Sequence, residues 1–510
     1  MAATLVWGRY VITGADTDGR VDLVENGAVY EEDGTIVEIG VYADLRARYE
    51  PDEVIGSTDH AVIPGLINAH HHVGLTPLQL GTLDAALEPW ITDRLSRRAA
   101  DPYLDTMWGA ITMIEAGITT VMHNDTSIVG SQPLDRSLEV LRAYRESGMR
   151  VAFSVFYREQ NRLVYLDDET FLQGLPVDLA TPTRAGLAQS DMSHETYLSL
   201  FEELHQQFGQ DAESRVRILL APGNVQWCSD EYLEKVKATA ERFGTGIHIH
   251  LLESPYQKVY AERMWGTTAV EHLHGLGFLG PEVSCAHGVW LTATDLDLLA
   301  QTGTTVCHNP SSNLRLKSGI APVNRMLAAG VPVALGIDEA TINDDNDLLQ
   351  EMRLAAKLHR EPGVNAPQLT SGQVLHMATA AGAHATCFGA QIGRLAAGLR
   401  ADIVQLKLNR IEEPYLSPAI DAIDALVGRG RATDIDTVIV DGEVLLRDGR
   451  LVGIDREAIV NEIQATMGLA ETSDEAERRR QGQELVGHVN AFYAGWDLAE
   501  GDPHYLLNQV

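Results

Sequence analysis

One stretch decides the fold of this chain: Pro64-Gly65-Leu66-Ile67-Asn68-Ala69-His70-His71-His72. It follows the apolar run Ala61-Val62-Ile63, so we expect a buried strand that passes into a loop. Because side chains two apart on a strand share a face, His70 and His72 point one way and His71 points the other. Two imidazoles at one strand end supply half of a metal site, although three histidines in a row are also compatible with ordinary loop polarity.

The middle of the chain repeats an apolar segment followed by a helical pattern. The expected strands are 62–67, 119–123, 150–156, 216–221, 246–251, 283–286, 305–308 and 331–336. Each is apolar on both faces, which is typical of parallel strands buried between helices. Eight such units predict an α/β fold, a (β/α)8 TIM barrel over residues 61–394. A doubly wound open sheet is the alternative, and it is disfavoured because no glycine-rich dinucleotide loop follows the first strand.

The two ends of the chain differ from this middle part. Residues 1–60 and 395–455 contain short β-rich pieces separated by Gly and Asp, which predicts one small β-sandwich domain built from both ends. Residues 456–510 are expected to form a C-terminal helical extension. Its charged run 475–480 is typical of a solvated face, and its aromatic tail is expected to pack on the barrel or on a neighbouring subunit. The polar segment 157–191 lies where a barrel enzyme carries substrate loops, but a plain surface insertion fits equally well.

Composition argues against several classes of partner. The 510-residue chain has 72 Asp and Glu against 39 Lys and Arg, a net charge of −33, so nucleic acid and anionic membranes are poor partners. The start of the chain lacks the pattern of a signal peptide, and no uncharged apolar run approaches the length of a membrane span. The four cysteines include no CxxC pair, and two of them, Cys285 and Cys307, lie inside apolar runs, as is typical of reduced core thiols. These features predict a soluble, cytoplasmic protein.

Other strand ends add groups to the histidines of the first strand. The active sites of (β/α)8 barrels lie at the carboxyl ends of the strands. The fifth strand ends with His248, His250 and Glu253. His250 lies nearer the mouth, so we expect it, rather than His248, to be the third metal ligand. The sixth strand ends with His287, and Asp338 follows the eighth, where a buried carboxylate needs a cation as its partner.

At this point the chain resembles the amidohydrolase superfamily, in the branch that contains cytosine deaminase, guanine deaminase, adenosylhomocysteine deaminase and the triazine hydrolases. The matching residues are Pro64-Gly65 through His72, His250 with Glu253, His287 in Ala-His-Gly-Val-Trp-Leu, His308-Asn309-Pro310-Ser311-Ser312-Asn313, Gly336-Ile337-Asp338, and Val438-Ile439-Val440-Asp441-Gly442 near the close. The resemblance covers about residues 1–455 and leaves the C-terminal extension outside it.

The resemblance implies one divalent metal ion held by His70, His72, His250 and Asp338, with one position open for water. Imidazole and carboxylate ligands suit zinc, with iron(II) as the alternative, and an open position is what a catalytic metal needs. Relatives with two metals use a modified lysine on the fourth strand. That strand reads Arg-Ile-Leu-Leu-Ala-Pro here, without lysine, which favours a single ion. Relatives are often oligomers, so a homo-oligomer is expected.

Three residues are expected to act in the reaction itself. Glu253 is placed to carry a proton between the nucleophile and the substrate nitrogen. His287 is expected to polarise the attacked centre or to stabilise the charge that develops there. Asp338 can both bind the metal and accept a proton. A carboxylate at a helix N-terminus is the structural alternative for Glu253, and a buried core histidine is the alternative for His287.

Substrate contacts are less strongly indicated. Trp90, Arg158 and Asn309 are the candidates. A core position for Trp90 and a surface position for Arg158 are nearly as compatible with the sequence. Glu339 stands where the branch often has Gly, which affects the expected substrate rather than the metal site.

Together these features predict a metal-dependent hydrolase of a non-peptide carbon–nitrogen bond. The favoured reaction is deamination of a small nitrogen heterocycle by an aminohydrolase. The alternatives with the same single-metal site are an amide, urea or carbamate hydrolase and a triazine-type dechlorinase. A non-enzymatic scaffold is disfavoured because all four ligand positions are retained, together with Glu253 and His287.

Overall fold

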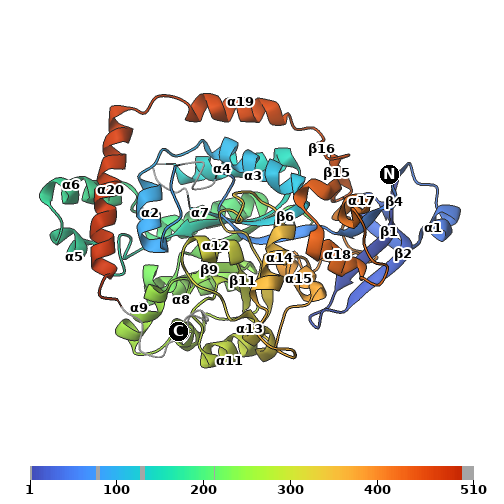
Figure 1. Ribbon diagram of the computed structural model, residues 1–510. Helices are drawn as coiled ribbons and strands as arrows, with labels where there is room; N and C mark the ends of the chain where they lie inside the picture. The colour runs from blue at the N-terminus through green and yellow to red at the C-terminus, as the bar shows by residue number, and fades with distance from the viewer. Residues whose placement is uncertain (1–2, 76–80, 127–131, 212, 497–510) are drawn as a thin grey trace.

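The computed structural model describes residues 3–75, 81–126, 132–211 and 213–496. Within these residues, eight parallel strands lie side by side in chain order (Figure 1). They are β5 (Leu66–His71), β6 (Ile118–Asp125), β7 (Arg150–Tyr157), β8 (Val216–Pro222), β9 (Ile247–Leu251), β10 (Val283–His287), β11 (Thr305–His308) and β12 (Val333–Leu335). A parallel bridge between His71 and Asp338 links the two ends of this sheet. The predicted (β/α)8 barrel is confirmed.

Helices pack around the barrel and on its upper rim. Those from the first barrel loop to the last are α2 (Leu87–Leu95), α3 (Pro102–Glu115), α4 (Pro133–Ser147), α5 (Asp168–Gln173), α6 (Val177–Gln189), α7 (His194–Phe208), α8 (Asp230–Phe243), α9 (Pro255–Trp265), α10 (Ala269–Gly275), α11 (Ala293–Thr302), α12 (Pro310–Arg315), α13 (Val323–Ala329), α14 (Leu348–Leu358), α15 (Ser371–Met377) and α16 (Ala380–Ala385). Helix α8 illustrates how the sequence sets the ends of these helices. Ser229 caps its first turn, and Gly244 ends it with a left-handed backbone conformation.

A second sheet joins the two ends of the chain. Its strands are β1 (Ala3–Ala15), β2 (Val21–Glu32), β3 (Thr35–Val41), β4 (Glu53–Pro64), β13 (Ile403–Lys407), β14 (Ile435–Val440), β15 (Glu443–Arg447) and β16 (Arg450–Leu451), and α1 (Tyr42–Arg48), α17 (Leu408–Glu412) and α18 (Ala422–Arg429) accompany them. The halves meet where β13 pairs antiparallel with β4, and both contribute to one apolar cluster. A small β domain formed from both chain ends is thereby confirmed.

The prediction of one barrel strand over 62–67 is wrong in its first half. Ala61, Val62 and Ile63 belong to β4 and pair with β13 of the second sheet. The barrel strand begins at Leu66, after Gly65, whose missing side chain leaves room for Thr119. Consequently His70 and His71 lie within the strand rather than in the loop that follows it.

A buried ion pair connects the barrel to the second sheet. Arg150 on β7 is fully buried and donates two hydrogen bonds to Asp402, from Nε to Oδ2 at 3.1 Å and from Nη2 to Oδ1 at 2.9 Å. Removal of the carboxylate leaves a buried guanidinium with too little compensating charge. We therefore expect Asp402→Ala to lower the free energy of unfolding by about 3–5 kcal/mol, measured by denaturant titration.

The matched control is the exposed pair of Arg9 and Asp59, which lie 4.0 Å apart. Asp59→Ala should change the free energy of unfolding by less than about 1 kcal/mol, because exposed pairs contribute little. Equal effects of the two substitutions would contradict the proposed role of the buried pair.

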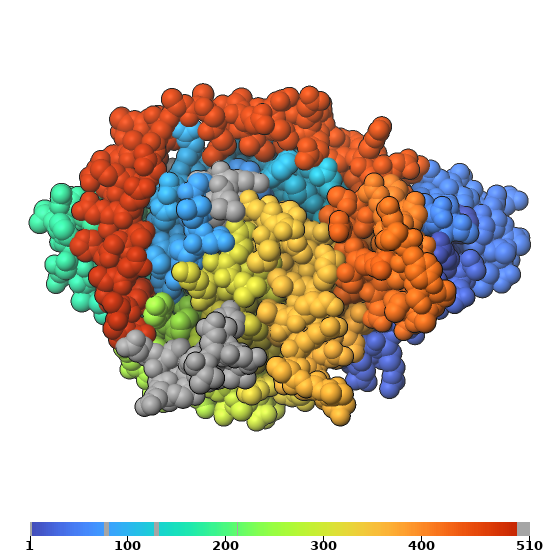
Figure 2. Space-filling view, viewed as in Figure 1, coloured from blue at the N-terminus to red at the C-terminus, as the bar shows by residue number. Residues whose placement is uncertain are grey.

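The C-terminal extension consists of α19 (Arg456–Met467) and α20 (Ser473–Tyr493). Figure 2 shows it as a band that passes over the barrel and down one side, next to the residues of α2. Helix α20 and the insertion that contains α5 and α6 share one apolar cluster, with Phe171, Leu179, Leu485 and Val489 among its members. The aromatic tail therefore packs on this chain. Among the described residues, no helix has both the length and the apolar character needed to cross a lipid bilayer.

Candidate active site

The four predicted metal ligands meet at the carboxyl ends of the barrel strands. The Nε2 atoms of His72 and His250 lie 3.3 Å apart. Asp338 Oδ1 lies 3.4 Å from His70 Nε2 and 3.3 Å from His72 Nε2. All four side chains are buried, and His70 forms one close group with His72 and His250 and another with Asp338 and His287.

Hydrogen bonds behind the cluster determine which ring nitrogen faces inward. His72 Nδ1 donates to the carbonyl of Asn124 at 2.7 Å, and His250 Nδ1 donates to the carbonyl of Gly223 at 3.0 Å. His70 Nδ1 lies 2.7 Å from His248 Nε2, and His248 Nδ1 lies 2.7 Å from Ser284 Oγ. This arrangement assigns the proton of each of the three rings to Nδ1 and leaves the Nε2 lone pairs directed at one another. His248 thus lies behind His70.

A cation is the group that fits among these atoms. Burial lowers the pKa of His70 to about 3 and that of His250 well below its usual value, so both rings are neutral near pH 7. His70 Nε2 is buried and has no hydrogen-bond partner. Converging lone pairs beside a buried carboxylate repel one another unless a positive ion lies between them. The donor set therefore fits a divalent metal.

Glu253 and His287 lie beside the cluster. His287 Nε2 is 3.6 Å from Glu253 Oε2 and 3.8 Å from Asp338 Oδ2. Asn313 Oδ1, 2.9 Å from His287 Nδ1, holds this ring from behind. Ser312 Oγ donates to Asp338 Oδ2 at 2.5 Å. Burial, together with the charge of Asp338, raises the pKa of Glu253 well above its usual value, as expected for a carboxyl group that exchanges protons.

A buried network supports Glu253 from outside the cavity. Gln257 Oε1 accepts from the backbone N–H of Glu253 at 2.8 Å, and Gln257 Nε2 lies 3.4 Å from the hydroxyl of Tyr165. That hydroxyl donates to Glu88 at 2.9 Å, and Ser254 donates to the same carboxyl oxygen. The N–H of Tyr165 in turn donates to the hydroxyl of Tyr493 on α20 at 2.9 Å. The C-terminal helix is thus linked by hydrogen bonds to the segment that carries Glu253.

Backbone strain is concentrated at the same strand ends. Val73, Leu252, His287 and Asp338 all have positive φ, with values of 128°, 47°, 78° and 67°. Such angles are unfavourable for residues with a side chain, and they persist where the surrounding structure enforces them. Two of these residues are site residues and the other two directly adjoin His72 and Glu253.

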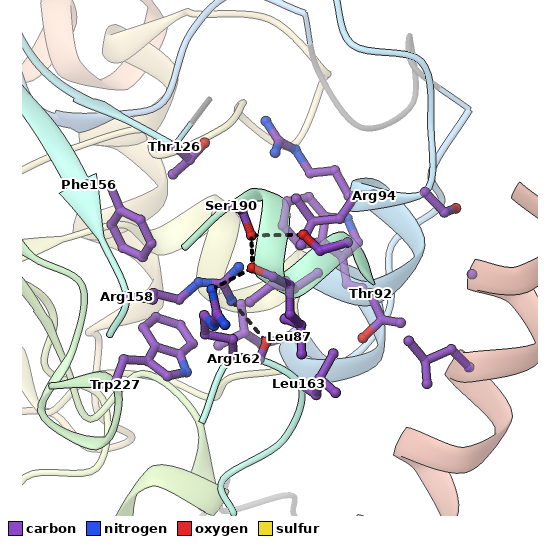
Figure 3. A pocket seen from close by; sticks show the side chains of 18 of the residues that line it. Leu87, Thr92, Arg94, Thr126, Phe156, Arg158, Arg162, Leu163, Ser190 and Trp227 are labelled. Atoms are coloured by element: carbon purple, nitrogen blue, oxygen red, sulfur yellow. Dashed lines mark hydrogen bonds between the residues drawn. The ribbon is translucent and has the colours of Figure 1, made fainter. Parts of the chain in front are cut away.

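The cluster lies in a cavity of about 430 Å³, a typical size for a small-molecule site. Trp90 and Arg158 line it, as do His72, His250, Glu253, His287 and Asp338. Figure 3 shows Phe156, Arg158 and Trp227 grouped together in the cavity wall. Asn309 is not among the lining residues; it is fully buried, and its Nδ2 lies 3.4 Å from His287 Nδ1.

Several residues at the site escaped the sequence analysis. Glu88, Tyr165 and Gln257 support Glu253, whereas α6 and α20 contribute side chains to the outer wall of the cavity. Glu339, the unusual residue after Asp338, lies 3.6 Å from Arg94 and also lines the cavity. Residues of α6 line the cavity, so segment 157–191 forms part of the cavity wall.

Comparison with known proteins identifies the family. A model of the amidohydrolase family matches residues 61–445. The 5'-deoxyadenosine deaminase of Methanosarcina mazei is 31% identical over 496 residues, which cover 96% of this chain and 100% of that protein. The 5-methylthioadenosine/S-adenosylhomocysteine deaminase of Desulforudis audaxviator is 31% identical, covering 91% of this chain and 97% of the relative.

Among solved structures, an adenosine deaminase from Xanthomonas campestris with bound zinc has the same fold. Its TM-score is 0.77 at 24% identity, and the match covers 94% of this chain and 99% of that one. The chain belongs to the amidohydrolase family, and it is a hydrolase that acts on carbon–nitrogen bonds.

Proposed function

We propose that this protein is an aminohydrolase that removes the 6-amino group of an adenosine-type nucleoside as ammonia. The observation that carries the proposal is the meeting of three histidines and Asp338 with Glu253 and His287 inside a cavity of about 430 Å³. The relatives named as deaminases of 5'-deoxyadenosine and of 5-methylthioadenosine, which align over nearly their whole lengths, support the nucleoside substrate.

The proposed resident metal is one zinc ion, with iron(II) as the alternative. His70, His72, His250 and Asp338 would hold it through the inward-facing atoms described above. Such an ion acts as a Lewis acid that makes hydroxide available near neutral pH. Strand β8, Val216–Pro222, contains no lysine, which supports a single ion rather than a pair.

The proposed roles of the other residues follow from their positions. Glu253 takes a proton from the attacking water and delivers it to the leaving nitrogen. His287 donates from Nδ1 to Asn313 Oδ1, which leaves Nε2 facing Glu253 at 3.6 Å; once Nε2 has taken up a proton from the attacking water, the ring stabilises the charge that develops at the attacked centre. Asn309 positions His287 from behind, whereas Trp90 and Arg158 contact the substrate from the cavity wall.

We also infer that the protein works in the cytoplasm as a homo-oligomer. The four cysteines are free thiols, and three of them are buried, which supports a reducing compartment. The oligomeric state rests on the resemblance to amidohydrolases alone.

Ammonia release from a panel of substrates tests the proposed function. We expect zinc-loaded enzyme to convert adenosine or 5'-deoxyadenosine to the inosine analogue with kcat/KM of about 10⁴ M⁻¹ s⁻¹ or more, because a matched enzyme and substrate fall in that range. Guanine, cytosine, a linear amide, a urea and a chlorotriazine serve as comparison substrates. Turnover of the amide, the urea or the chlorotriazine without turnover of any aminopurine would instead support the alternative hydrolases.

A further inference from the structure

Glu253 lies in a turn whose backbone shape is fixed on both sides. Leu252, just before it, has a positive φ of 47°, and its carbonyl accepts hydrogen bonds from the backbone N–H groups of Val289 and Trp290, both at 3.0 Å. Ser254, just after it, is the N-cap of α9, but its hydroxyl makes no hydrogen bond to the described first turn of that helix. Serine is favoured at an N-cap because it normally makes this bond. The Ser254 hydroxyl therefore serves another contact.

The other contact of Ser254 is with Glu88 on α2. Ser254 Oγ and the hydroxyl of Tyr165 donate to the same atom, Glu88 Oε1, the latter at 2.9 Å. The second oxygen, Oε2, has no hydrogen-bond partner within the part of the chain that the structure describes. Glu88 is buried and is not one of the residues that line the cavity. Its carboxyl group thus holds two hydroxyls together from a position that does not face the substrate.

The same hydrogen bonds continue to the main chain of Glu253. The hydroxyl of Tyr165 lies 3.4 Å from Gln257 Nε2, and Gln257 Oε1 accepts from the backbone N–H of Glu253 at 2.8 Å. Glu88 therefore acts on both sides of Glu253, through Tyr165 and Gln257 on the N–H and through Ser254 on the residue that follows. A shift of Glu88 would move the turn from which Glu253 reaches the cavity.

Tyr493 on α20 contacts this network by two routes. Its hydroxyl accepts a hydrogen bond from the backbone N–H of Tyr165 at 2.9 Å. Its ring centre lies 4.6 Å from that of Tyr256, which belongs to the first turn of α9, and Figure 1 shows the end of α20 beside this helix. Tyr493 is buried, and the cavity-lining residues do not include it. Through this residue the C-terminal extension contacts both the insertion and the helix that begins just after Glu253.

We propose that Glu88 and Tyr493 are positioning residues for the reaction: together they hold the turn that carries Glu253, so that Tyr493 of the C-terminal extension contributes to proton transfer without touching the substrate. The inference rests on the proposed function for the role of Glu253. A general acid–base group must lie within hydrogen-bond reach of the proton that it moves. A displacement of about 1 Å, even one caused from outside the site, can lower a rate by about 100-fold.

The first test compares Tyr493→Phe with Tyr197→Phe in zinc-loaded enzyme, using the nucleoside that the wild type deaminates fastest. Tyr493→Phe removes one hydrogen bond and keeps the ring, so kcat should fall by about 3- to 10-fold, the usual worth of such a bond. KM should stay within about twofold, because Tyr493 does not line the cavity. Tyr197 is the matched control, because its buried hydroxyl also accepts a backbone N–H, from Ala221 at 2.8 Å, outside this network; its kcat should match that of the wild type. An equal kcat in the two variants, or a change in KM alone, overturns the role of Tyr493.

The second test compares Glu88→Leu with Glu88→Gln. Leucine offers no acceptor to the hydroxyls of Ser254 and Tyr165, so kcat should fall by about 10- to 100-fold at unchanged metal content, with KM within about twofold. Glutamine keeps Oε1, the oxygen that accepts both bonds, so Glu88→Gln should recover kcat to within about threefold of the wild type. Equal losses of kcat in the two variants overturn the role of Glu88.

Hydrogen–deuterium exchange of the same full-length proteins examines the turn without turnover. The backbone N–H of Glu253 is protected by its bond to Gln257, so Tyr493→Phe and Glu88→Leu should raise the exchange rate of peptides that cover residues 251–258 by about 3- to 10-fold, whereas the control variant should match the wild type. Faster exchange in a protein that deaminates none of the nucleosides supports the positioning contacts, and the proposed function alone then fails. Unchanged exchange, or faster exchange with an unchanged kcat in an active enzyme, overturns the proposal.

Discussion

His250→Ala is expected to remove the bound metal and, with it, nearly all activity. Nε2 of His250 lies 3.3 Å from Nε2 of His72, and alanine has no side-chain atom that can replace this ligand. An ion that activates water contributes several kcal/mol to the reaction, so its loss should lower kcat/KM by about 10³-fold or more. Metal analysis of dialysed protein measures the effect directly: we expect about one equivalent of metal in the wild type and none in the variant.

His71→Leu is the matched control for this variant. His71 lies on β5 beside His70 and is fully buried, but among the described residues neither of its ring nitrogens has a hydrogen-bond partner, and it belongs to neither of the two groups of candidate metal ligands. Leucine of similar size should therefore leave metal content and activity close to those of the wild type. Two tightly bound equivalents in the wild type would contradict the single-ion site, and full metal content in His250→Ala would contradict the ligand assignment.

The barrel was predictable because its strands are buried on both faces. Such strands appear as continuous apolar runs, and the polar residue that follows each run marks the carboxyl end. The same property explains the error at 62–67. Apolar runs in β4 and β5 are separated by Pro64 and Gly65 alone, and periodicity does not reveal which sheet a buried strand joins. The pairing of β4 with β13, more than 300 residues away, is a long-range contact that local pattern does not encode.

The metal cluster could be predicted for a different reason. His70 and His250 lie at the carboxyl ends of β5 and β9, and Asp338 follows β12, so the topology of the barrel alone brings them together. The supporting residues could not be found in this way. Glu88 looks like an ordinary acidic residue in the first turn of a helix, and Tyr165 lies in an insertion without clear periodicity.

The part of the cavity wall formed by α20 was even harder to predict from the sequence. The charged run 475–480 is what a solvated helix face looks like, yet Glu475 pairs with Arg98 and Arg478 borders the substrate cavity. Which side of α20 meets the barrel depends on the close approach of Gly482 to Ser96. That contact joins residues nearly 400 positions apart, and nothing near Gly482 in the sequence distinguishes it from a glycine on an exposed helix face.

Glu253→Gln is expected to separate proton transfer from metal binding. The amide has the shape of the carboxyl group and can keep the contacts of the backbone with Gln257, but it cannot donate and accept the transferred proton. We therefore expect kcat to fall by about 10²–10⁴-fold, the usual contribution of a general acid–base group. The metal content, the thermal stability and the affinity for substrate should remain close to those of the wild type.

Asp338→Asn is the comparison variant for Glu253→Gln. Asp338 Oδ1 lies within 3.4 Å of Nε2 of both His70 and His72, whereas Glu253 Oε2 lies 3.6 Å from His287 Nε2 and, among the described residues, belongs to neither group of candidate ligands. Asp338→Asn should therefore lose metal affinity and rate together, while Glu253→Gln loses rate only. Loss of metal in Glu253→Gln would make Glu253 a ligand. Near-wild-type activity in that variant would assign it a structural role, because the proton would then have to move through a different group.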